Sequence, residues 1–167
     1  MASRVSLLDY QRELSERIRS AGAGRIVSKL GLQVAGESWL VDLADAAEVI
    51  PVPPITPVAL MQPWLKGLAN VRGTLHTVID VAVFVGRQPA VAGERTRLLI
   101  VAERFGLAAG LLVDASLGLR HPGQLERCDE APAPWMRAVF ADRDGRRWSE
   151  LDLAGLVQHP GFLAAGV

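Results

Sequence analysis

The side chains that most often carry chemistry are sparse and scattered in this sequence. Its three histidines, His76, His121 and His159, lie far apart and in different predicted elements. A metal site built from histidine or cysteine needs ligands at short spacings such as HExxH or CxxC, and neither pattern occurs. His76 and Asp80 are four residues apart, but a predicted strand end and a helix cap separate them. We therefore predict no metal site.

The single cysteine, Cys128, is the remaining candidate nucleophile. Arg127 on one side would favour a thiolate, whereas Asp129 and Glu130 on the other side oppose it. We therefore favour an exposed loop thiol, and an enzyme acting through Cys128 is the most remote alternative. A lone cysteine also excludes an intrachain disulfide and fits a reducing compartment.

The acidic residues and the glycines add no catalytic constellation. Asp80, Asp114 and Asp152 each close a predicted strand or open a predicted helix, where capping is the ordinary role of aspartate. The sequence has no Gly-x-Ser-x-Gly, no Walker loop and no dinucleotide fingerprint. These absences predict a binding or scaffolding protein.

One cation is placed unusually. Arg72 lies in Asn70-Val71-Arg72-Gly73, the most polar part of an otherwise apolar stretch from Pro63 to Gly86. An arginine amid hydrophobic strands either pairs with an acid of its own chain or is offered to a partner. From the residues alone, the intrachain pair is the commoner case, and both interpretations stay open.

The composition limits the classes to which this chain can belong. Its 167 residues suffice for one domain or for two small subdomains that share a core. Lys+Arg and Asp+Glu both number 18, and a net charge of zero argues against a nucleic-acid-binding module. Half of the residues are hydrophobic, so we expect a packed core and not a disordered chain.

We expect neither a secretory signal nor a membrane span. Asp9 and Glu13 fall where a signal peptide would need its apolar region. The most apolar stretch, residues 98–113, is interrupted by Glu103 and Arg104 and is too short to cross a bilayer. The expected location is the cytoplasm.

The elements that must position these residues are mostly short strands. Runs of β-branched and alternating apolar residues bounded by turn residues are typical of strands. The predicted strands span residues 29–34, 39–43, 68–72, 74–79, 97–102, 107–113, 117–120, 135–141 and 146–151. Asp142 to Gly145, between the last two strands, is a strong hairpin signal.

Helices are few and short in this prediction. Residues 6–20 form an amphipathic helix that docks on its own domain or, alternatively, on a partner, and a small-residue hinge follows at 21–24. Brief helical segments are predicted at 44–50, 63–67, 81–85 and 153–157. Prolines make 51–57 an extended connection; 121–134 is predicted as an irregular loop, and residues beyond 157 as a weakly ordered tail. The sum is an all-β chain of small barrels.

A series of motifs runs in order through the chain. The most specific part is Asn70-Val71-Arg72-Gly73 followed by Val78-Ile79-Asp80. The others are Leu32, Trp39-Leu40-Val41, Glu48-Val49-Ile50, Ile55-Thr56-Pro57-Val58, Gly67-Leu68-Ala69, Gly110-Leu111-Leu112-Val113-Asp114 and Leu151-Asp152-Leu153. In this order they resemble the CheW-like domain of bacterial chemosensory systems. Ala59 and Thr77 stand where that family usually has proline.

The resemblance implies two packed, five-stranded SH3-like barrels with an N-terminal helix and short helices. It divides the chain into a helical extension at 1–24, a CheW-like domain at 25–160 and a tail at 161–167. The first barrel is expected at about 25–90 and the second at about 91–160, with an exchange of strands between them left open.

The resemblance also implies a role. Such proteins are non-enzymatic adaptors that couple the cytoplasmic tip of a methyl-accepting chemoreceptor to the regulatory domain of a CheA-like histidine kinase, at membrane-bound receptor arrays. By this resemblance the receptor-binding residues are Asn70, Val71, Arg72 and Gly73, with Glu48 close enough to pair with Arg72 or with the receptor. The resemblance names no kinase-binding residue, no metal and no cofactor.

Residues 7–13 belong to an N-terminal segment longer than in minimal CheW proteins. It resembles the PilI-type coupling proteins of type IV pilus systems, which implies control of twitching motility. Two other classes stay open: a CheW-fold adaptor with another output, and a β-barrel that binds a small molecule or an oligonucleotide. Such a barrel needs an aromatic or basic face, and the sequence offers only one such cluster: Arg143, Arg146, Arg147 and Trp148, with acids between them.

Overall fold

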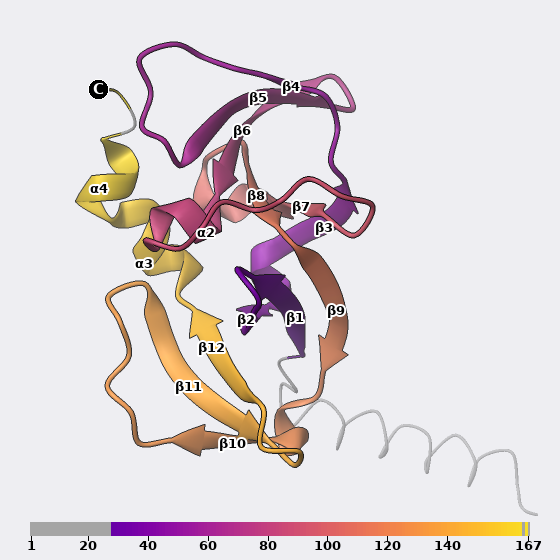
Figure 1. Ribbon diagram of the computed structural model, residues 1–167, viewed down its shortest axis with the longest axis vertical. Coiled ribbons are helices and arrows are strands. Elements are labelled where there is room, and N and C mark those ends of the chain that lie inside the picture. Colours follow the sequence, from indigo (N-terminus) through magenta and orange to yellow (C-terminus); the bar gives the residue numbers. More distant parts are fainter. Residues whose placement is uncertain (1–27, 165, 167) are drawn as a thin grey trace, which may run out of the picture.

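The computed structural model describes residues 28–164 and residue 166. These residues form twelve strands arranged in two six-stranded sheets, with a few short helices at one side (Figure 1). The predicted all-β architecture is confirmed. Each sheet holds six strands where five per barrel were expected. The predicted N-terminal helix and its hinge lie outside the described residues.

One sheet is built from the two ends of the described chain, and we call it the terminal sheet. Its strand order is β10-β11-β12-β2-β1-β9. All neighbours are antiparallel except β12 and β2, which run parallel. The strands are β1 (Lys29–Val34), β2 (Glu37–Asp42), β9 (Ala115–Arg120), β10 (Leu125–Cys128), β11 (Met136–Asp142) and β12 (Arg147–Leu151).

The other sheet comes from the middle of the chain, and we call it the middle sheet. Its order is β3-β7-β8-β6-β5-β4, with one parallel pair, β6 and β8. At the start of that pair, the Thr77 N–H donates to the Ala108 carbonyl at 2.9 Å, a bond that proline could not make. The strands are β3 (Ala46–Pro51), β4 (Ile55–Thr56), β5 (Leu65–Val71), β6 (Thr74–Asp80), β7 (Arg97–Val101) and β8 (Ala109–Val113).

The two sheets do not divide the chain at residue 90. Strands β1 and β2 belong with β9–β12, and the whole middle sheet lies between them in the sequence. Local hairpin signals identify neighbouring strands, but they do not reveal the parallel β2–β12 pairing that assigns the first hairpin to the terminal sheet. The first hairpin therefore exchanges into the sheet built by the end of the chain.

The first hairpin shows how a local pattern fixes a strand pair. Leu30, Leu32 and Val34 are all buried, as their alternation predicts. The turn residues Ala35 and Gly36 both have positive φ, 50° and 77°, which is the twist that a two-residue hairpin needs. The register that results, Lys29 opposite Asp42 and Val34 opposite Glu37, puts one face of the pair into the core.

The β11–β12 hairpin is organised by the carboxylate of Asp142. Its Oδ1 accepts hydrogen bonds from the backbone N–H groups of Asp144 (3.0 Å) and Arg146 (2.9 Å). Its Oδ2 accepts from Trp148 Nε1 at 2.9 Å. Gly145 adopts φ 77°, so this predicted turn is confirmed in position and in backbone conformation.

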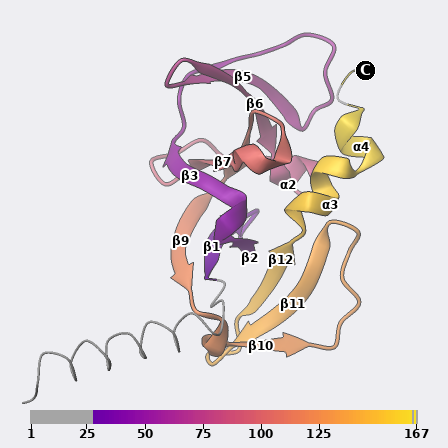
Figure 2. The same cartoon turned by 180° about the vertical axis from the view of Figure 1, so that it is seen from behind.

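Three short helices lie together beside the sheets: α2 (Val81–Phe84), α3 (Leu153–Gln158) and α4 (Pro160–Leu163). Figure 2 shows them from behind, on the same side of the molecule. Asp80 and Asp152 cap α2 and α3 through hydrogen bonds from Val83 N and Gly155 N, so the predicted capping roles are confirmed. Asp114 instead ends β8 and accepts from the Gly36 N–H at 3.2 Å.

Part of the predicted tail is integral to the fold. Phe162, on α4, is buried and stacks on Trp64 at a centroid distance of 5.5 Å, while Phe84 of α2 meets both rings edge-on. The prediction of a weakly ordered tail beyond residue 157 is therefore wrong for this segment, because aromatic packing holds it on the core.

Three local predictions are wrong for a common reason. Residues 63–67 are not helical, because Leu65 pairs with Ile79 and the Trp64 carbonyl accepts from the Asp80 N–H at 2.7 Å. Residues 46–50 join strand β3, after a 3₁₀ turn at Leu43–Asp45, because β7 pairs along them. The predicted loop 121–134 contains β10, which pairs with β11. Sheet pairing overrode weak local propensity in each case.

The main core joins the two sheets. It includes Leu32 and Val41 of the terminal sheet with Leu99 and Leu111 of the middle sheet. A smaller cluster lies within the middle sheet, around Val78, Leu98 and Leu112. Within residues 28–164, no helix is long and apolar enough to cross a membrane.

The Gly145 turn generates a first prediction. Gly145→Val forces a β-branched residue to φ 77°, and we expect unfolding free energy to fall by about 1 kcal/mol or more. Thermal melting measures this. Gly93→Val is the matched control, since Gly93 has no positive φ and a Cβ there meets only Thr96 Oγ1 at 3.9 Å. Equal losses in both variants would contradict the prediction.

Asp142 generates a second prediction, on pH. The hydrogen bond from Trp148, with those from Arg146 and Asp144, lowers the pKa of Asp142 below its usual value. A carboxylate with a lowered folded-state pKa contributes stability above its unfolded pKa, and that stability is lost as pH falls through the folded-state value. Asp142→Asn should therefore flatten the decline in stability as the pH falls from about 5 to about 3.

Urea midpoints across this pH range check the second prediction. Asp144→Asn is the control, because it removes one charge from the same exposed turn and leaves the three hydrogen bonds to Asp142 in place. If Asp142→Asn and the unsubstituted protein lose stability in parallel as the pH falls, the role given to Asp142 is wrong.

Candidate functional site

The candidate site is built on the tight turn between β5 and β6. Val71 pairs with Thr74, so Arg72 and Gly73 are the two turn residues. Their φ angles are 50° and 87°, the pattern of a type I′ hairpin turn. Asn70 Oδ1 accepts a hydrogen bond from the Gly73 N–H at 2.8 Å and braces the turn. The turn is therefore tight and well supported.

Arg72 occupies a strained backbone position. The sequence placed it at a strand end, but it lies in the turn itself, in the left-handed region that favours Gly, Asn and Asp. A residue in this conformation without such a preference costs on the order of 1 kcal/mol or more and persists only where the surrounding structure holds it. The β5–β6 ladder on both sides supplies that constraint.

The guanidinium of Arg72 makes a two-pronged ion pair with Glu48. Arg72 Nη2 lies 2.8 Å from Glu48 Oε2, and Nη1 donates to Oε1 at 3.0 Å. Yet the Arg72 side chain is 78% exposed, while Glu48 is 27% exposed. Arg72 is therefore paired within the chain and exposed to solvent at the same time, so the two interpretations of the sequence do not exclude each other. The pair orients the planar fork without burying it.

Glu48 reaches Arg72 from a different strand. It lies on β3, opposite Ile100 of β7, just after a register shift between Ala46 and Glu48. A bulge of this kind redirects the side chain that follows it. The pairing of β3 with β7, and not local propensity, thus brings residue 48 to the turn at residue 72.

A groove of about 410 Å³ runs beside this ion pair, and we call it the Arg72 groove. Val71, Ile100 and Val101 are buried and form an apolar floor, and charged side chains stand at the rim. The lining residues are Ala47, Glu48, Val71, Arg72, Thr74, His76, Ile100, Val101, Glu103, Gly106, Leu107 and Ala108. A groove with this composition suits an amphipathic segment of another protein.

The structure sorts the five predicted site residues into two sets. Glu48, Val71 and Arg72 line the groove, whereas Asn70 braces the turn and Gly73 lies exposed beside it. The other lining residues of the Arg72 groove were not predicted from the sequence. The alternation along β6, which puts residues 74 and 76 on one face, could have found some of them. The segment 106–108 carried no comparable signal.

The residues considered for other chemistry stay apart. Within residues 28–164, no three His, Cys, Asp or Glu side chains are grouped as metal ligands. Cys128 is half-buried on β10, opposite Val139, and not in an irregular loop as expected. His76 Nδ1 lies 3.1 Å from its neighbour Thr74 O, a contact internal to β6.

The comparisons with known proteins now give the class. The family of CheW-like domains matches residues 29–161, and the chain belongs to that family. CheW-like scaffolding proteins are non-enzymatic adaptors in chemosensory signalling. The resemblance drawn from the order of the sequence motifs is confirmed.

One protein of similar sequence and one solved structure show how far the similarity extends. The chain is 30% identical over 146 residues to the protein PilI of Pseudomonas aeruginosa strain PAO1, covering 84% of this chain and 80% of PilI. The crystal structure of the scaffolding protein TtCheW from Thermoanaerobacter tengcongensis superposes with a TM-score of 0.68 at 22% identity. That match covers 80% of this chain and 94% of TtCheW, and it shows the fold.

The strained turn generates a third prediction. Arg72→Asn replaces arginine with a residue that favours positive φ, and it deletes an exposed ion pair worth about 0–1 kcal/mol. The free energy of unfolding of Arg72→Asn should either exceed that of the unsubstituted protein or fall below it by no more than about 1 kcal/mol. Arg72→Val, which removes the same ion pair but resists φ 50°, should be clearly less stable. Chemical denaturation of both variants measures this, and equal destabilisation would count against backbone strain at residue 72.

Proposed function

We propose that this chain is a non-enzymatic adaptor that couples the cytoplasmic tip of a methyl-accepting chemoreceptor to a CheA-like histidine kinase. Membership of the CheW-like family supports this role. The observation that carries the proposal is the Arg72 guanidinium, held by Glu48 yet 78% exposed at the rim of an apolar-floored groove. Asn70, Val71, Arg72, Gly73 and Glu48 form the proposed receptor-binding site.

The geometry suggests how the receptor binds. The methyl-accepting receptor tip is helical, and a helix can present a carboxylate to Arg72 while its apolar residues enter the groove. Two of the five N–H donors of Arg72 are used by Glu48, so others remain for the partner. Because the turn is tight and its arginine already oriented, little conformational entropy is lost on binding.

The pathway and the location form part of the same proposal. Similarity to PilI supports an adaptor of a type IV pilus system, with twitching motility as the output. We place the adaptor in the cytoplasm, recruited to membrane-bound receptor arrays. An adaptor that holds both partners at once must offer the kinase a face other than the Arg72 groove.

The fourth prediction separates receptor binding from folding. Arg72→Ala should weaken binding of the receptor-tip fragment by roughly 1–3 kcal/mol, the range for a charge-assisted contact. It should change stability by no more than about 1 kcal/mol, because the ion pair with Glu48 is exposed. Arg72→Lys should restore only part of the affinity, because lysine lacks the planar fork.

A pull-down with this chain from a lysate of the source cells first identifies the receptor, as the one recovered together with a histidine kinase. The tip fragment of that receptor is then used in the titration. Calorimetric titration gives the affinity, and a melting curve of each variant gives the stability. Arg143→Ala is the control, since Arg143 is an exposed arginine outside the groove. Unchanged binding with a large drop in melting temperature would show that Arg72 serves the fold and not the receptor.

A further inference from the structure

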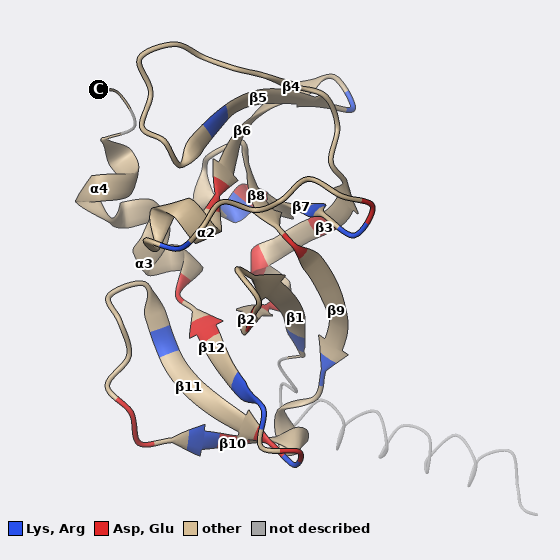
Figure 3. Ribbon diagram, in the orientation of Figure 1, with Lys and Arg blue, Asp and Glu red and all other residues tan. Residues whose placement is uncertain are grey.

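A second groove, of about 610 Å³, is lined by three arginines from distant parts of the sequence. Arg95 comes from the loop before β7, Arg146 directly precedes β12, and Arg147 is the first residue of β12. Figure 3 shows basic residues on both segments. We call it the three-arginine groove; its other lining residues are Gln33, Gly36, Glu37, Ser38, Leu117 and Ser149. The Arg72 groove shares none of these residues.

The charge balance of this groove is positive although the chain is neutral overall. Its one lining carboxylate, Glu37, is engaged by Arg87, whose Nε donates to Glu37 Oε1 at 3.0 Å. Arg147 pairs with Glu130 from the loop after β10. Among the described residues, neither Arg95 nor Arg146 takes part in an ion pair. Neither guanidinium is therefore ion-paired with a carboxylate, although the nearby Asp142 carboxylate attracts Arg146.

Several of these groups are fixed in place before any ligand arrives. The Arg146 guanidinium lies over the Trp148 ring at 5.8 Å, and the Arg146 backbone is tied to Asp142. Ser149 is half-buried, and its strand is held by the parallel pairing with β2. The hydroxyls of Ser38 and Ser149 stand beside the arginines as further donors. Pre-oriented donors of this kind favour an anionic ligand.

We propose that the three-arginine groove binds an acidic peptide segment of a partner protein. Guanidinium groups match carboxylates in a two-pronged geometry, and Arg147 is already paired with the carboxylate of Glu130. The volume leaves room for the side chains of a short extended segment. Carboxylates of that segment pair with Arg95 and Arg146. The proposal is independent of the receptor-binding role of Arg72.

The test uses the full chain and fluorescence anisotropy with two labelled peptides. One peptide consists of aspartate, glutamate and serine, and the other has asparagine and glutamine in place of the acids. We expect only the acidic peptide to bind saturably, and its affinity should fall as salt is added. The double variant Arg95→Gln with Arg146→Gln should bind about tenfold more weakly or worse. Arg95→Gln alone should bind with intermediate affinity.

The controls distinguish this site from general charge attraction. Arg143→Gln removes a cation from the same hairpin outside the groove, and it should leave binding unchanged. Arg72→Ala should also leave peptide binding unchanged, so failure here and failure of the receptor-binding role are separable. Melting curves establish that each variant is folded, and Arg95→Gln changes an exposed loop residue.

Three results would overturn the proposal. The first is that the acidic peptide does not bind at all, and the second is that Arg143→Gln weakens its binding as much as the double variant does. Finally, inorganic phosphate at matched ionic strength could displace the peptide better than chloride does, which would make this a site for small oxyanions and not for a peptide.

Discussion

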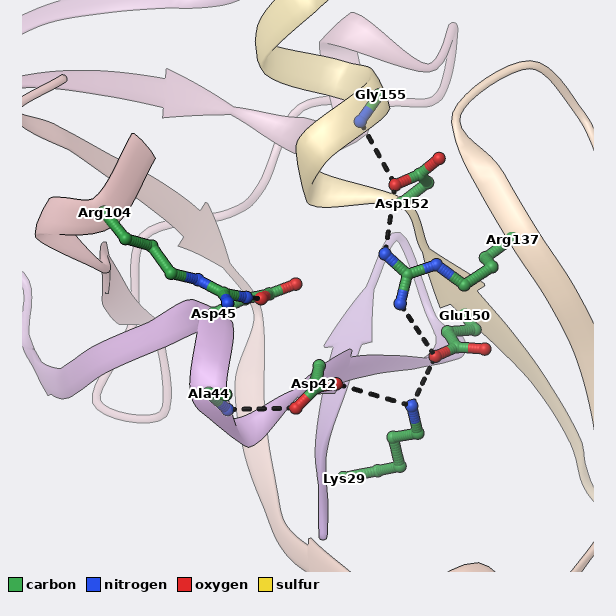
Figure 4. Close-up of polar contacts among 9 residues, drawn as sticks. All are labelled: Lys29, Asp42, Ala44, Asp45, Arg104, Arg137, Glu150, Asp152 and Gly155. Atoms are coloured by element: carbon green, nitrogen blue, oxygen red, sulfur yellow. Dashed lines mark hydrogen bonds and ion pairs between the residues drawn. The ribbon is translucent and has the colours of Figure 1, made fainter. Parts of the chain in front are cut away.

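The parallel pairing of β2 with β12 is the contact on which the rest of the structure depends. It sets Trp39 beside Ser149 and Leu40 beside Glu150, and so joins the start of the domain to its end. Next to it, the buried carboxylate of Glu150 receives Lys29 Nζ at 2.5 Å, and Arg137 bridges Glu150 to Asp152 (Figure 4). A buried carboxylate without such a partner would be strongly destabilising, so this network specifies one register. Asp152 then caps α3, which leads into the aromatic contacts of α4.

Sequence reasoning succeeded where structure is local and failed where it is not. The hairpins at Ala35-Gly36 and at Asp142–Gly145, and the caps at Asp80 and Asp152, follow from turn and capping chemistry over a few residues. The division between sheets depends on β2 with β12 and β6 with β8, parallel pairs that leave no short-range mark. The helix predicted at 63–67 failed because Leu65 and Gly67 pair in the sheet, where Gly67 allows a close approach of β4 and does not end a helix. At φ 138° it leaves room for Thr56, whose carbonyl would lie 2.1 Å from an added Cβ.

The candidate site divides in the same way. Residues 70–73 were singled out because a polar tetrapeptide between two apolar strands is visible in the sequence, whereas their receptor-binding role and the choice of Glu48 came from the family resemblance. The strain at Arg72 and the bulge that directs Glu48 were not visible, because both arise from pairing across the middle sheet. Asparagine would suit the turn better, so the arginine is not explained by stability. A charged fork kept in an unfavourable backbone conformation points to recognition.

The nesting of one sheet inside the other has a consequence for the order in which the protein is made. All six strands of the middle sheet have been synthesised once residue 113 has left the ribosome, so these strands can pair with one another at that point. The hairpin of β1 and β2 is made earlier, yet its partners β9 and β12 are made only afterwards. During synthesis this hairpin therefore exposes apolar side chains and an unpaired edge, a condition that favours misassembly between chains. β1 and β2 are thus made before the strands that pair with them, and β12 completes the terminal sheet.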